Sequence, residues 1–297
     1  MCLFSMKIFK DCIYIKDANL KDYCTFKIGG QAKHLYTTYT NTALLEVCNY
    51  CNVHNIKYKI IGNGSNLLFD DKGYNGAIIV NRSKKLRFVD NFVYADGGTN
   101  IGEIIQKSTQ RNLSGFEYFA GIPSSVAGGI INSLGAFDKQ ISDLVEYVIC
   151  YKKNNLKKRI ILKKVDCHFE YRNSLFKHED YVITRVKFKL TRDDKTKIFE
   201  RMKSCLNKKI STQPVDNHSA GSVFKRSTLI PAKIIDELGL KGKNIGDAQI
   251  SVKHAGFIIN NANARSKDVQ QLIDYINDCV YRQFKQKFDL EIEYIPY

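Results

Sequence analysis

The sequence predicts an α+β protein of more than one domain, and three observations support this prediction. Strand, helix and strand patterns succeed one another at residues 34–39, 42–54 and 58–61, which indicates a small β-α-β unit. Apolar residues alternate with lysines at 186–190, as in a half-buried antiparallel strand. At 191–195 the pattern changes to a charged junction. We therefore expect a domain boundary there, with a mixed α and β region on each side.

The order of the elements predicts three units: residues 1–80, residues 81–192 and a C-terminal α+β domain at 193–297. After a lead-in at 13–30, the other strands are expected at 77–80, 92–95, 145–151, 181–190, 256–259 and 290–295, and the other helices at 101–112, 198–206, 231–238 and 266–284. Helix caps support these bounds, because Asn100 with Glu103 forms a capping-box pattern, and Pro231 and Gly239 punctuate the helix at 231–238.

The composition is that of a folded globular protein with a large positive charge. Hydrophobic residues make up 44% and charged residues 26% of the 297 positions, so disorder is not indicated. The net charge of +16 requires that nucleic-acid and membrane roles be weighed. Part of the excess lies at 152–164, which we interpret as a solvated basic hairpin. No apolar run is long enough to span a membrane. We expect neither a nucleic acid nor a membrane as partner.

The cysteines and histidines predict no metal site and no disulfide framework. Nine cysteines without the spacing of a secreted framework, and residues 1–12 without a leader pattern, predict a cytoplasmic protein. Cys48 and Cys51 form the only C-x-x-C, but helical spacing explains them as packing residues. The histidines are too isolated for zinc.

Two glycine-containing loops predict a site for an anionic cofactor. The first, 62–66, follows an apolar strand and reads Gly-Asn-Gly-Ser-Asn; the second, 121–125, reads Gly-Ile-Pro-Ser-Ser and opens a small-residue helix. Backbone N–H groups at such turns and at helix N-termini favour phosphate, so two loops together suggest a clamped diphosphate. For either loop alone an ordinary glycine-rich turn is the better interpretation, and it is the presence of both loops that favours a cofactor site. The third glycine of a dinucleotide-binding fingerprint is absent, as is a P-loop.

Five motifs in register resemble the UDP-N-acetylenolpyruvoylglucosamine reductase (MurB) family, from about residue 25 to residue 295. They are Ile61-Gly62-Asn63-Gly64-Ser65-Asn66, Ala120-Gly121-Ile122-Pro123-x-Ser125-Val126-x-Gly128-Gly129 with Gly135-Ala136-Phe137, Tyr171-Arg172-x-Ser174, Ser219-Ala220-Gly221-Ser222-x-Phe224 and Leu290-Glu291-x-Glu293. The resemblance implies an FAD-binding fold of the vanillyl-alcohol-oxidase (PCMH) type in the first two units and a substrate-binding C-terminal domain. It also implies that NADPH reduces the FAD, which then reduces UDP-N-acetylglucosamine-enolpyruvate to UDP-N-acetylmuramate for peptidoglycan.

The resemblance also assigns roles to residues. Hydride addition to the enolpyruvyl double bond places negative charge beside the carboxylate, and the family implies that Arg172 and Glu293 stabilise it while Ser222 donates a proton. Lys225, Arg226 and Gln249 are implied substrate contacts. The implied cofactor site comprises Ile61, Gly62, Asn63, Gly64, Ser65, Asn66, Leu67, Gly121, Ile122, Pro123, Ser124, Ser125, Val126, Gly128, Gly129, Gly135 and Ile183. Strand alternation alone leaves open whether Glu291 or Glu293 enters the site.

The sequence departs from the family pattern at three positions. Ser124 and Ala127 stand where glycines are usual, and Ser133 stands where Asn is common. Side chains at 124 and 127 are expected to crowd the diphosphate if those positions need glycine. Two alternatives therefore stay open: another FAD-dependent oxidase or dehydrogenase of this fold, and a basic binding protein without enzymatic activity. The short segment between Arg172 and Ser222 resembles the compact subtype of the family, and we expect a monomer.

Overall fold

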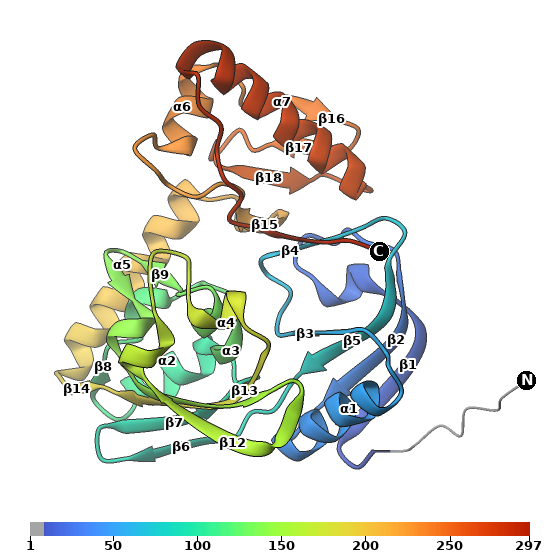
Figure 1. Ribbon diagram of the computed structural model, residues 1–297. Helices are drawn as coiled ribbons and strands as arrows, with labels where there is room; N and C mark the ends of the chain where they lie inside the picture. Colours follow the sequence, from blue (N-terminus) through green and yellow to red (C-terminus); the bar gives the residue numbers. More distant parts are fainter. Residues whose placement is uncertain (1–8) are drawn as a thin grey trace, which may run out of the picture.

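The computed structural model describes residues 9–297, and three β-sheets organise it. Figure 1 shows two of these sheets lying side by side, with the third standing above them at the C-terminal end of the chain. Residues 1–8, which carry most of the N-terminal segment without a leader pattern, lie outside the described residues. No helix in residues 9–297 combines the length and the apolar character that a membrane span requires.

The first sheet is mixed, in the order β1-β2-β5-β3. β1 and β2 are antiparallel, whereas β5 is parallel to both β2 and β3. The helix α1 crosses over from β2 to β3 and buries Leu44, Val47, Cys48 and Cys51 against one face, which is the predicted β-α-β unit. The bounds are β1 Cys12–Asn19, η1 Leu20–Tyr23, β2 Gln31–Thr38, α1 Asn41–Val53, β3 Tyr58–Ile61, β4 Leu67–Phe69 and β5 Tyr74–Asn81.

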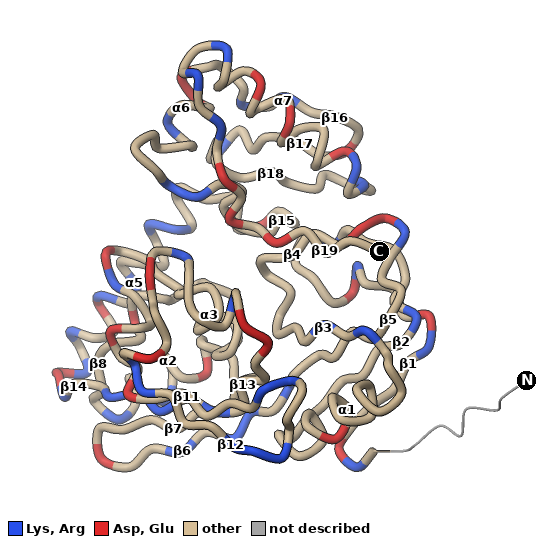
Figure 2. The backbone as a smooth tube through the Cα atoms, viewed as in Figure 1, with Lys and Arg blue, Asp and Glu red and all other residues tan. Residues whose placement is uncertain are grey.

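The second sheet has five antiparallel strands, in the order β12-β11-β13-β7-β6. Apolar residues of the short helices α2 and α3 and of the turn η2 pack on one face of it. β11 and β12 form the predicted basic hairpin, whose blue segments follow β12 in Figure 2. The bounds are β6 Leu86–Val89, β7 Phe92–Asp96, α2 Ile101–Thr109, β8 Leu113–Ser114, η2 Glu117–Phe119, α3 Val126–Ile131, β9 Gly135–Ala136, β10 Lys139–Gln140, η3 Ile141–Asp143, β11 Val145–Lys152, β12 Asn155–Lys163, η4 Lys164–Cys167, α4 Leu175–His178, β13 Tyr181–Lys189 and β14 Thr191–Arg192.

The long helix α5 leads into the third sheet, whose order is β15-β18-β17-β16. All its pairings are antiparallel, and the long helix α7 packs on one of its faces. After α7 the chain leaves this sheet. Its last strand, β19, pairs in parallel with β4 beside the first sheet. The bounds are α5 Lys195–Thr212, β15 His218–Ser222, α6 Pro231–Glu237, β16 Asn244–Ile245, β17 Ala248–Ile250, β18 Phe257–Asn260, α7 Ser266–Phe284 and β19 Glu293–Ile295.

One hydrophobic cluster joins the N-terminal and C-terminal parts of the chain. It brings Leu35 and Val80 of the first sheet together with Phe224, Leu272 and Ile292 of the C-terminal region. A second cluster lies under the five-stranded sheet, and a third lies between α1 and the first sheet. The proposed boundary at residues 192 and 193 directly follows β14, and that at 80 and 81 falls within the last residues of β5. The first and third proposed units therefore share a core across the chain.

Most predicted elements agree with the structure, and the differences have physical causes. β3 and α7 have the expected bounds. The predicted lead-in at 13–30 was wrong in part, because β1 occupies its first half; Ile13 and Ile15 of this strand are half-exposed, so no half-buried alternation marks it. The predicted strand at 290–295 was too long, because only Glu293–Ile295 pairs as a strand. The helix at 101–112 ends at Thr109.

Candidate active site

The two glycine-containing loops lie against each other. A Cβ on Gly62 would lie 2.1 Å from Ser125 Oγ, so this position has room for hydrogen alone unless Ser125 moves. The Asn63 side-chain amide donates a hydrogen bond to the Pro123 carbonyl at 3.3 Å, and its oxygen accepts one from Arg82 Nη1 at 2.5 Å. The structure therefore brings together the two loops that the sequence singled out.

The glycines of these loops serve the protein backbone as well as any ligand. Gly64 has φ +64°, and a Cβ on it would lie 2.1 Å from the Tyr23 carbonyl oxygen. Gly129 faces the Ile141 side chain, with 3.1 Å to the position of an added Cβ. Gly64 thus needs glycine for backbone reasons, whether or not a cofactor is bound, whereas a side chain at Gly129 would only make a tight contact with Ile141. Ile61, Leu67, Val126 and Ile183 are buried core residues that support the loops from behind.

A cavity of about 510 Å³ opens beside the first loop. This volume lies within the range of small-molecule sites. Arg82 projects into it half-buried and has no ion-pair partner among residues 9–297, and burial lowers the pKa of its guanidinium. A buried cation without a carboxylate partner favours an anionic ligand. The polar residues that line the cavity are Tyr23, Thr37, Tyr39, Asn63, Arg82, Lys84, Asn100 and Glu103.

The first loop is tied to the C-terminal strand. The Asn66 carbonyl accepts a hydrogen bond from the Glu293 amide at 2.8 Å, and the Asn66 side chain donates one to the Glu291 carbonyl at 3.0 Å. Leu67 then pairs with Glu293 in the parallel β4–β19 ladder. Residues 290–293 therefore lie directly beside the candidate cofactor loop, although more than 220 positions separate Asn66 from Glu291 in the chain.

Ser222 occupies a bulge in β15. Ser219 lies opposite Ile259 and Ser222 opposite Phe257, so β15 carries one extra residue between these pairs. Gly221 in the bulge has φ +81°, a conformation that favours glycine, and an added Cβ there would meet no atom within 4 Å. The bulge thus faces open space. The Ser222 hydroxyl makes no hydrogen bond with any other described residue.

Arg172 joins β9 to the segment that precedes the C-terminal strand. Its Nε donates to Glu291 Oε1 at 2.5 Å, and its Nη2 donates to the Gly135 carbonyl at 3.1 Å. Both side chains of the pair are largely buried, at 20% and 16% exposed. Arg172 also has φ 54°, a left-handed backbone that costs about 1 kcal/mol or more in a non-glycine residue. The fold therefore holds this guanidinium in a strained and well-defined place.

The two glutamates of the C-terminal motif have different partners. Glu291 pairs with Arg172, whereas Glu293 pairs with Lys59, which precedes the first loop on β3. The Glu293–Lys59 pair is also more open, with side chains 46% and 35% exposed. Strand alternation could not separate these roles, because residues 290–292 lie outside β19.

Further cations surround this carboxylate pair. Lys177 donates a hydrogen bond to the Arg172 carbonyl at 3.0 Å. Burial lowers the pKa of Lys177, and the nearby charge on Lys225 lowers it further, while the two glutamates oppose this change. Lys59, Lys177 and the Arg172–Glu291 pairing were missed from the sequence. Only Lys59, adjacent to the predicted loop, had a position that could have drawn attention to it.

Two of the three expected substrate-contact residues, Lys225 and Arg226, lie near the turn that carries Arg172. Lys225 follows Phe224, whose partner across an isolated bridge is Leu290. The backbone amide of Arg226 donates to the Tyr171 hydroxyl at 3.3 Å, which links it to the Arg172 turn. Gln249 lies further out: its amide donates to the Gly242 carbonyl, and its oxygen accepts from Asn261.

The departures from the family pattern are accommodated by contacts within the protein. Ser124 is buried, and its hydroxyl donates to the Ser125 carbonyl at 2.9 Å. The Ala127 methyl lies 3.2 Å from the place of an added Cβ on Gly97, so the missing side chain of Gly97 makes room for it. Ser133 is 1% exposed, with φ 44° and a hydroxyl that has no hydrogen-bond partner in the described chain.

Known proteins resemble this chain over nearly its whole length. Residues 213–295 match the model of the UDP-N-acetylenolpyruvoylglucosamine reductase C-terminal domain, and residues 33–153 match that of an FAD binding domain. The UDP-N-acetylenolpyruvoylglucosamine reductase of Clostridium novyi is 34% identical over 278 residues, which cover 93% of this chain and 90% of the relative. That of Thermosipho melanesiensis is 37% identical, with 92% and 93% covered.

A solved structure gives the same result. The UDP-N-acetylenolpyruvylglucosamine reductase (MurB) of Thermus caldophilus superposes with a TM-score of 0.81 at 30% identity, covering 96% of this chain and 99% of that one. The predicted α+β fold with an FAD-binding region is thereby confirmed. The chain belongs to the UDP-N-acetylenolpyruvoylglucosamine reductase family.

Proposed function

We propose that this protein is an FAD-dependent reductase that uses NADPH to convert UDP-N-acetylglucosamine-enolpyruvate into UDP-N-acetylmuramate for peptidoglycan synthesis. The observation that carries this proposal is the convergence of four motifs: the 62–66 loop touches the 121–125 loop at Ser125 and is hydrogen-bonded to residues 291 and 293, and Glu291 in turn holds Arg172. Relatives that match more than 90% of this chain carry the name of that reductase.

The residues present fit an FAD molecule. Gly62, Asn63 and Ser125 would hold its diphosphate where the two loops meet, and Arg82 supplies a cation at the edge of the adjacent cavity. The buried hydroxyls of Thr99 and Ser133 have no hydrogen-bond partner among the described residues. Buried hydroxyls are normally hydrogen-bonded, so a bound ligand is a candidate partner for them. FAD bound here supplies the hydride that adds to the enolpyruvyl double bond.

The protein's own groups stabilise the charge that develops on the substrate. As the double bond is reduced, negative charge gathers beside its carboxylate, and Arg172 would face it as a fixed guanidinium. Arg172 is held by Glu291 and by the Gly135 carbonyl, so it would not need to reorganise during the reaction. Glu293, as the family implies, acts beside it, and its carboxylate is paired with the ammonium group of Lys59.

Ser222 is the proposed proton donor. Its bulged strand leaves the hydroxyl without a protein partner and next to open space at Gly221. A free hydroxyl on a rigid strand is available to the substrate, and a carbanion is basic enough to take its proton. Lys225, Arg226 and Gln249 are the proposed contacts for the substrate's UDP moiety and sugar.

We also propose a cytoplasmic monomer with units at 1–80, 81–192 and 193–297. Eight cysteines within residues 9–297 are free, six of them buried, which suits a reducing compartment. Size-exclusion chromatography with light scattering tests the monomer, because a dimer would elute at about twice the chain's mass of 34.0 kDa.

A single-cuvette experiment tests the function. Purified protein is examined by visible absorption, then given NADPH and afterwards UDP-N-acetylglucosamine-enolpyruvate under anaerobic conditions. We expect a flavin spectrum that NADPH bleaches and the enolpyruvyl sugar restores. A flavin that stays reduced after the sugar is added would identify another FAD-dependent oxidoreductase. Colourless protein after loading with FAD would instead favour a basic binding protein.

A further inference from the structure

Lys209 is a buried lysine without a partner. It is 7% exposed, and its Nζ has no hydrogen-bond acceptor and no carboxylate within residues 9–297. Lysines are seldom fully buried unless they are paired, because desolvation of an ammonium costs several kcal/mol. No role for this residue follows from the family motifs in the sequence. Within residues 9–297 the ring of Phe137 is the group that faces this ammonium, so the site has room for an anionic partner.

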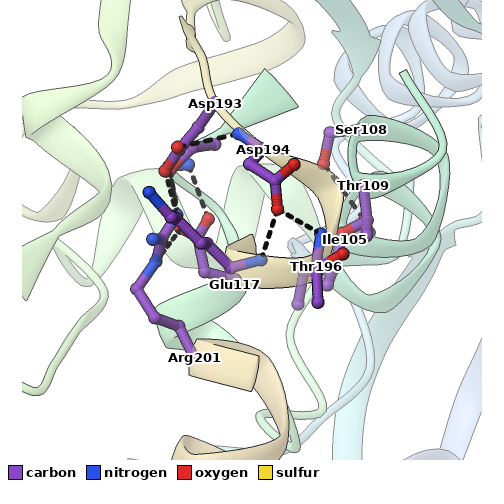
Figure 3. A network of polar contacts seen from close by, with 11 residues as sticks. Ile105, Ser108, Thr109, Glu117, Asp193, Asp194, Thr196 and Arg201 are labelled. Atoms are coloured by element: carbon purple, nitrogen blue, oxygen red, sulfur yellow. Dashed lines mark hydrogen bonds and ion pairs between the residues drawn. The ribbon is translucent and has the colours of Figure 1, made fainter. Parts of the chain in front are cut away.

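The fold fixes the position of this lysine firmly. Lys209 lies on α5 at a spacing of four and eight residues from Cys205 and Arg201, on the buried stripe of the helix. Arg201 anchors that stripe through Glu117, which is 1% exposed, and Asp193; Figure 3 shows this network at the start of α5. Lys209 lies two helical turns after Arg201 on the same face of the helix. The packing of α5 therefore fixes the position of the Lys209 side chain.

The surroundings of Lys209 belong to the candidate active site. A Cβ on Gly121, at the start of the second cofactor loop, would lie 3.6 Å from Lys209 Cδ. Nζ lies 5.8 Å from the centre of the Phe137 ring. Burial lowers the pKa of Lys209 to about 8; Cys205 opposes this, and the charge of Arg172 lowers it further. Phe137 is two residues from Gly135, whose carbonyl accepts a hydrogen bond from Arg172 Nη2. The lysine therefore lies near both the second loop and the segment that holds the guanidinium proposed to face the substrate.

We propose that Lys209 is a flavin-binding residue whose ammonium pairs with the negative charge of the reduced ring. This inference rests on the proposed function. Transfer of a hydride to a neutral flavin leaves the ring with one negative charge, so a nearby cation stabilises the reduced form selectively. The ring is a better partner than the diphosphate, because the diphosphate is proposed to lie where Ser125 meets Gly62, whereas the Lys209 ammonium lies by Phe137, two residues from the Gly135 carbonyl that holds Arg172. The reacting double bond must lie between that arginine and the flavin.

The test compares Lys209→Met with Lys208→Met. Lys208 Nζ is also 5.8 Å from the Phe137 ring but the side chain is exposed, so it is a control for general positive charge. For each variant we would measure the dissociation constant of oxidised FAD and the two-electron midpoint potential of the bound flavin. For Lys209→Met we expect oxidised FAD to bind within about threefold of wild type and reduced FAD to bind tenfold to a hundredfold more weakly. This corresponds to a potential lower by about 30 to 60 mV. Lys208→Met should leave both quantities unchanged.

Two other outcomes for Lys209→Met would contradict the proposal. Equal weakening of both redox forms, with an unchanged potential, would overturn the proposal in favour of a diphosphate contact. No change in either quantity would overturn it outright. Lys209→Arg should restore most of the potential, whereas a packing role predicts no such recovery. If Lys209→Met does not fold, Lys209→Gln takes its place. Failure of the wild type to bind FAD would refute the proposed function itself, whereas wild-type turnover with an unchanged variant potential would refute this inference alone.

Discussion

Replacing Glu291 and Glu293 by glutamine, one at a time, separates the structural and the chemical carboxylate. Glu291 holds Arg172 through a largely buried pair, and Glu293 holds Lys59 through a half-exposed one. Glutamine keeps the shape of either side chain and removes its charge. The two changes are therefore matched in size and sequence position, and they differ mainly in partner and burial.

The structure gives the expected magnitudes. Breaking a fully buried ion pair costs about 3 to 5 kcal/mol, and exposed pairs contribute about 0 to 1 kcal/mol. With roughly a fifth of each side chain exposed, the Arg172–Glu291 pair should lie between these limits, so Glu291→Gln should cost about 2 kcal/mol. In a chain of this size that lowers the melting temperature by about 3 °C. Glu293→Gln should cost less than about 1 kcal/mol.

The two variants should rank in the opposite order when kcat is compared in place of stability. Glu293→Gln is expected to lower kcat by about a hundredfold or more, as the loss of one preorganised charge does in other active sites. Glu291→Gln should lower kcat less than this, because Arg172 keeps its charge and its hydrogen bond to the Gly135 carbonyl, and it should also raise KM for the enolpyruvyl sugar. Urea denaturation and steady-state kinetics on the same preparations measure both effects. A stable Glu291→Gln protein together with an unstable Glu293→Gln protein would refute the assignment.

Three further predictions follow from single side chains. Ser222→Ala should lower kcat by about a hundredfold or more with an unchanged flavin spectrum, and full activity would exclude it as proton donor. Gly62→Ala should weaken FAD binding at least tenfold, because its methyl would meet Ser125 Oγ at 2.1 Å. Binding titration measures this loss, with Gly102→Ala as control, where an added Cβ would meet only the Asn100 side chain at 3.3 Å. The pKa of Lys209 falls from 10.5 to about 8 on folding, so FAD-free protein binds fewer protons than the unfolded chain between these values. Its free energy of unfolding relative to Lys209→Met should therefore rise from pH 8 to pH 10.5, and equal curves by urea denaturation would contradict this.

Much of the fold was predictable because local signals and tertiary structure agree. The long amphipathic helix at Ser266–Phe284 and the strand at Tyr58–Ile61 carry their periodicity and punctuation in the sequence. β1 has no such signal, because Ile13 and Ile15 point to the surface. The shared core between the first sheet and the C-terminal region was also unpredictable, since no local pattern records a contact between Val80 and residues two hundred positions later.

The loops that form the site were predictable from the sequence, but the ion pairs between its side chains were less so. Composition marked the two glycine-containing loops, and the family resemblance named Arg172 and Ser222. Which carboxylate meets Arg172 depends on where β19 begins, and strand alternation does not extend to Glu291. Lys209 carries no signal in the sequence, because a lysine on a helix is normally a solvated residue.

The charge balance of the site explains part of the chain's excess of positive residues. Lys59, Arg172, Lys177 and Lys209 gather near two glutamates, and Arg82 lies beside the first loop. Such an excess would destabilise the FAD-free protein through self-repulsion. Burial is the main cause of the lowered pKa values of Lys177 and Lys209, and the charge of Arg172 lowers both further. A diphosphate cofactor and a substrate with a diphosphate and a carboxylate would neutralise it. The same reasoning requires that FAD stabilise this protein against unfolding more strongly at low than at high salt, since screening weakens both the repulsion and its relief.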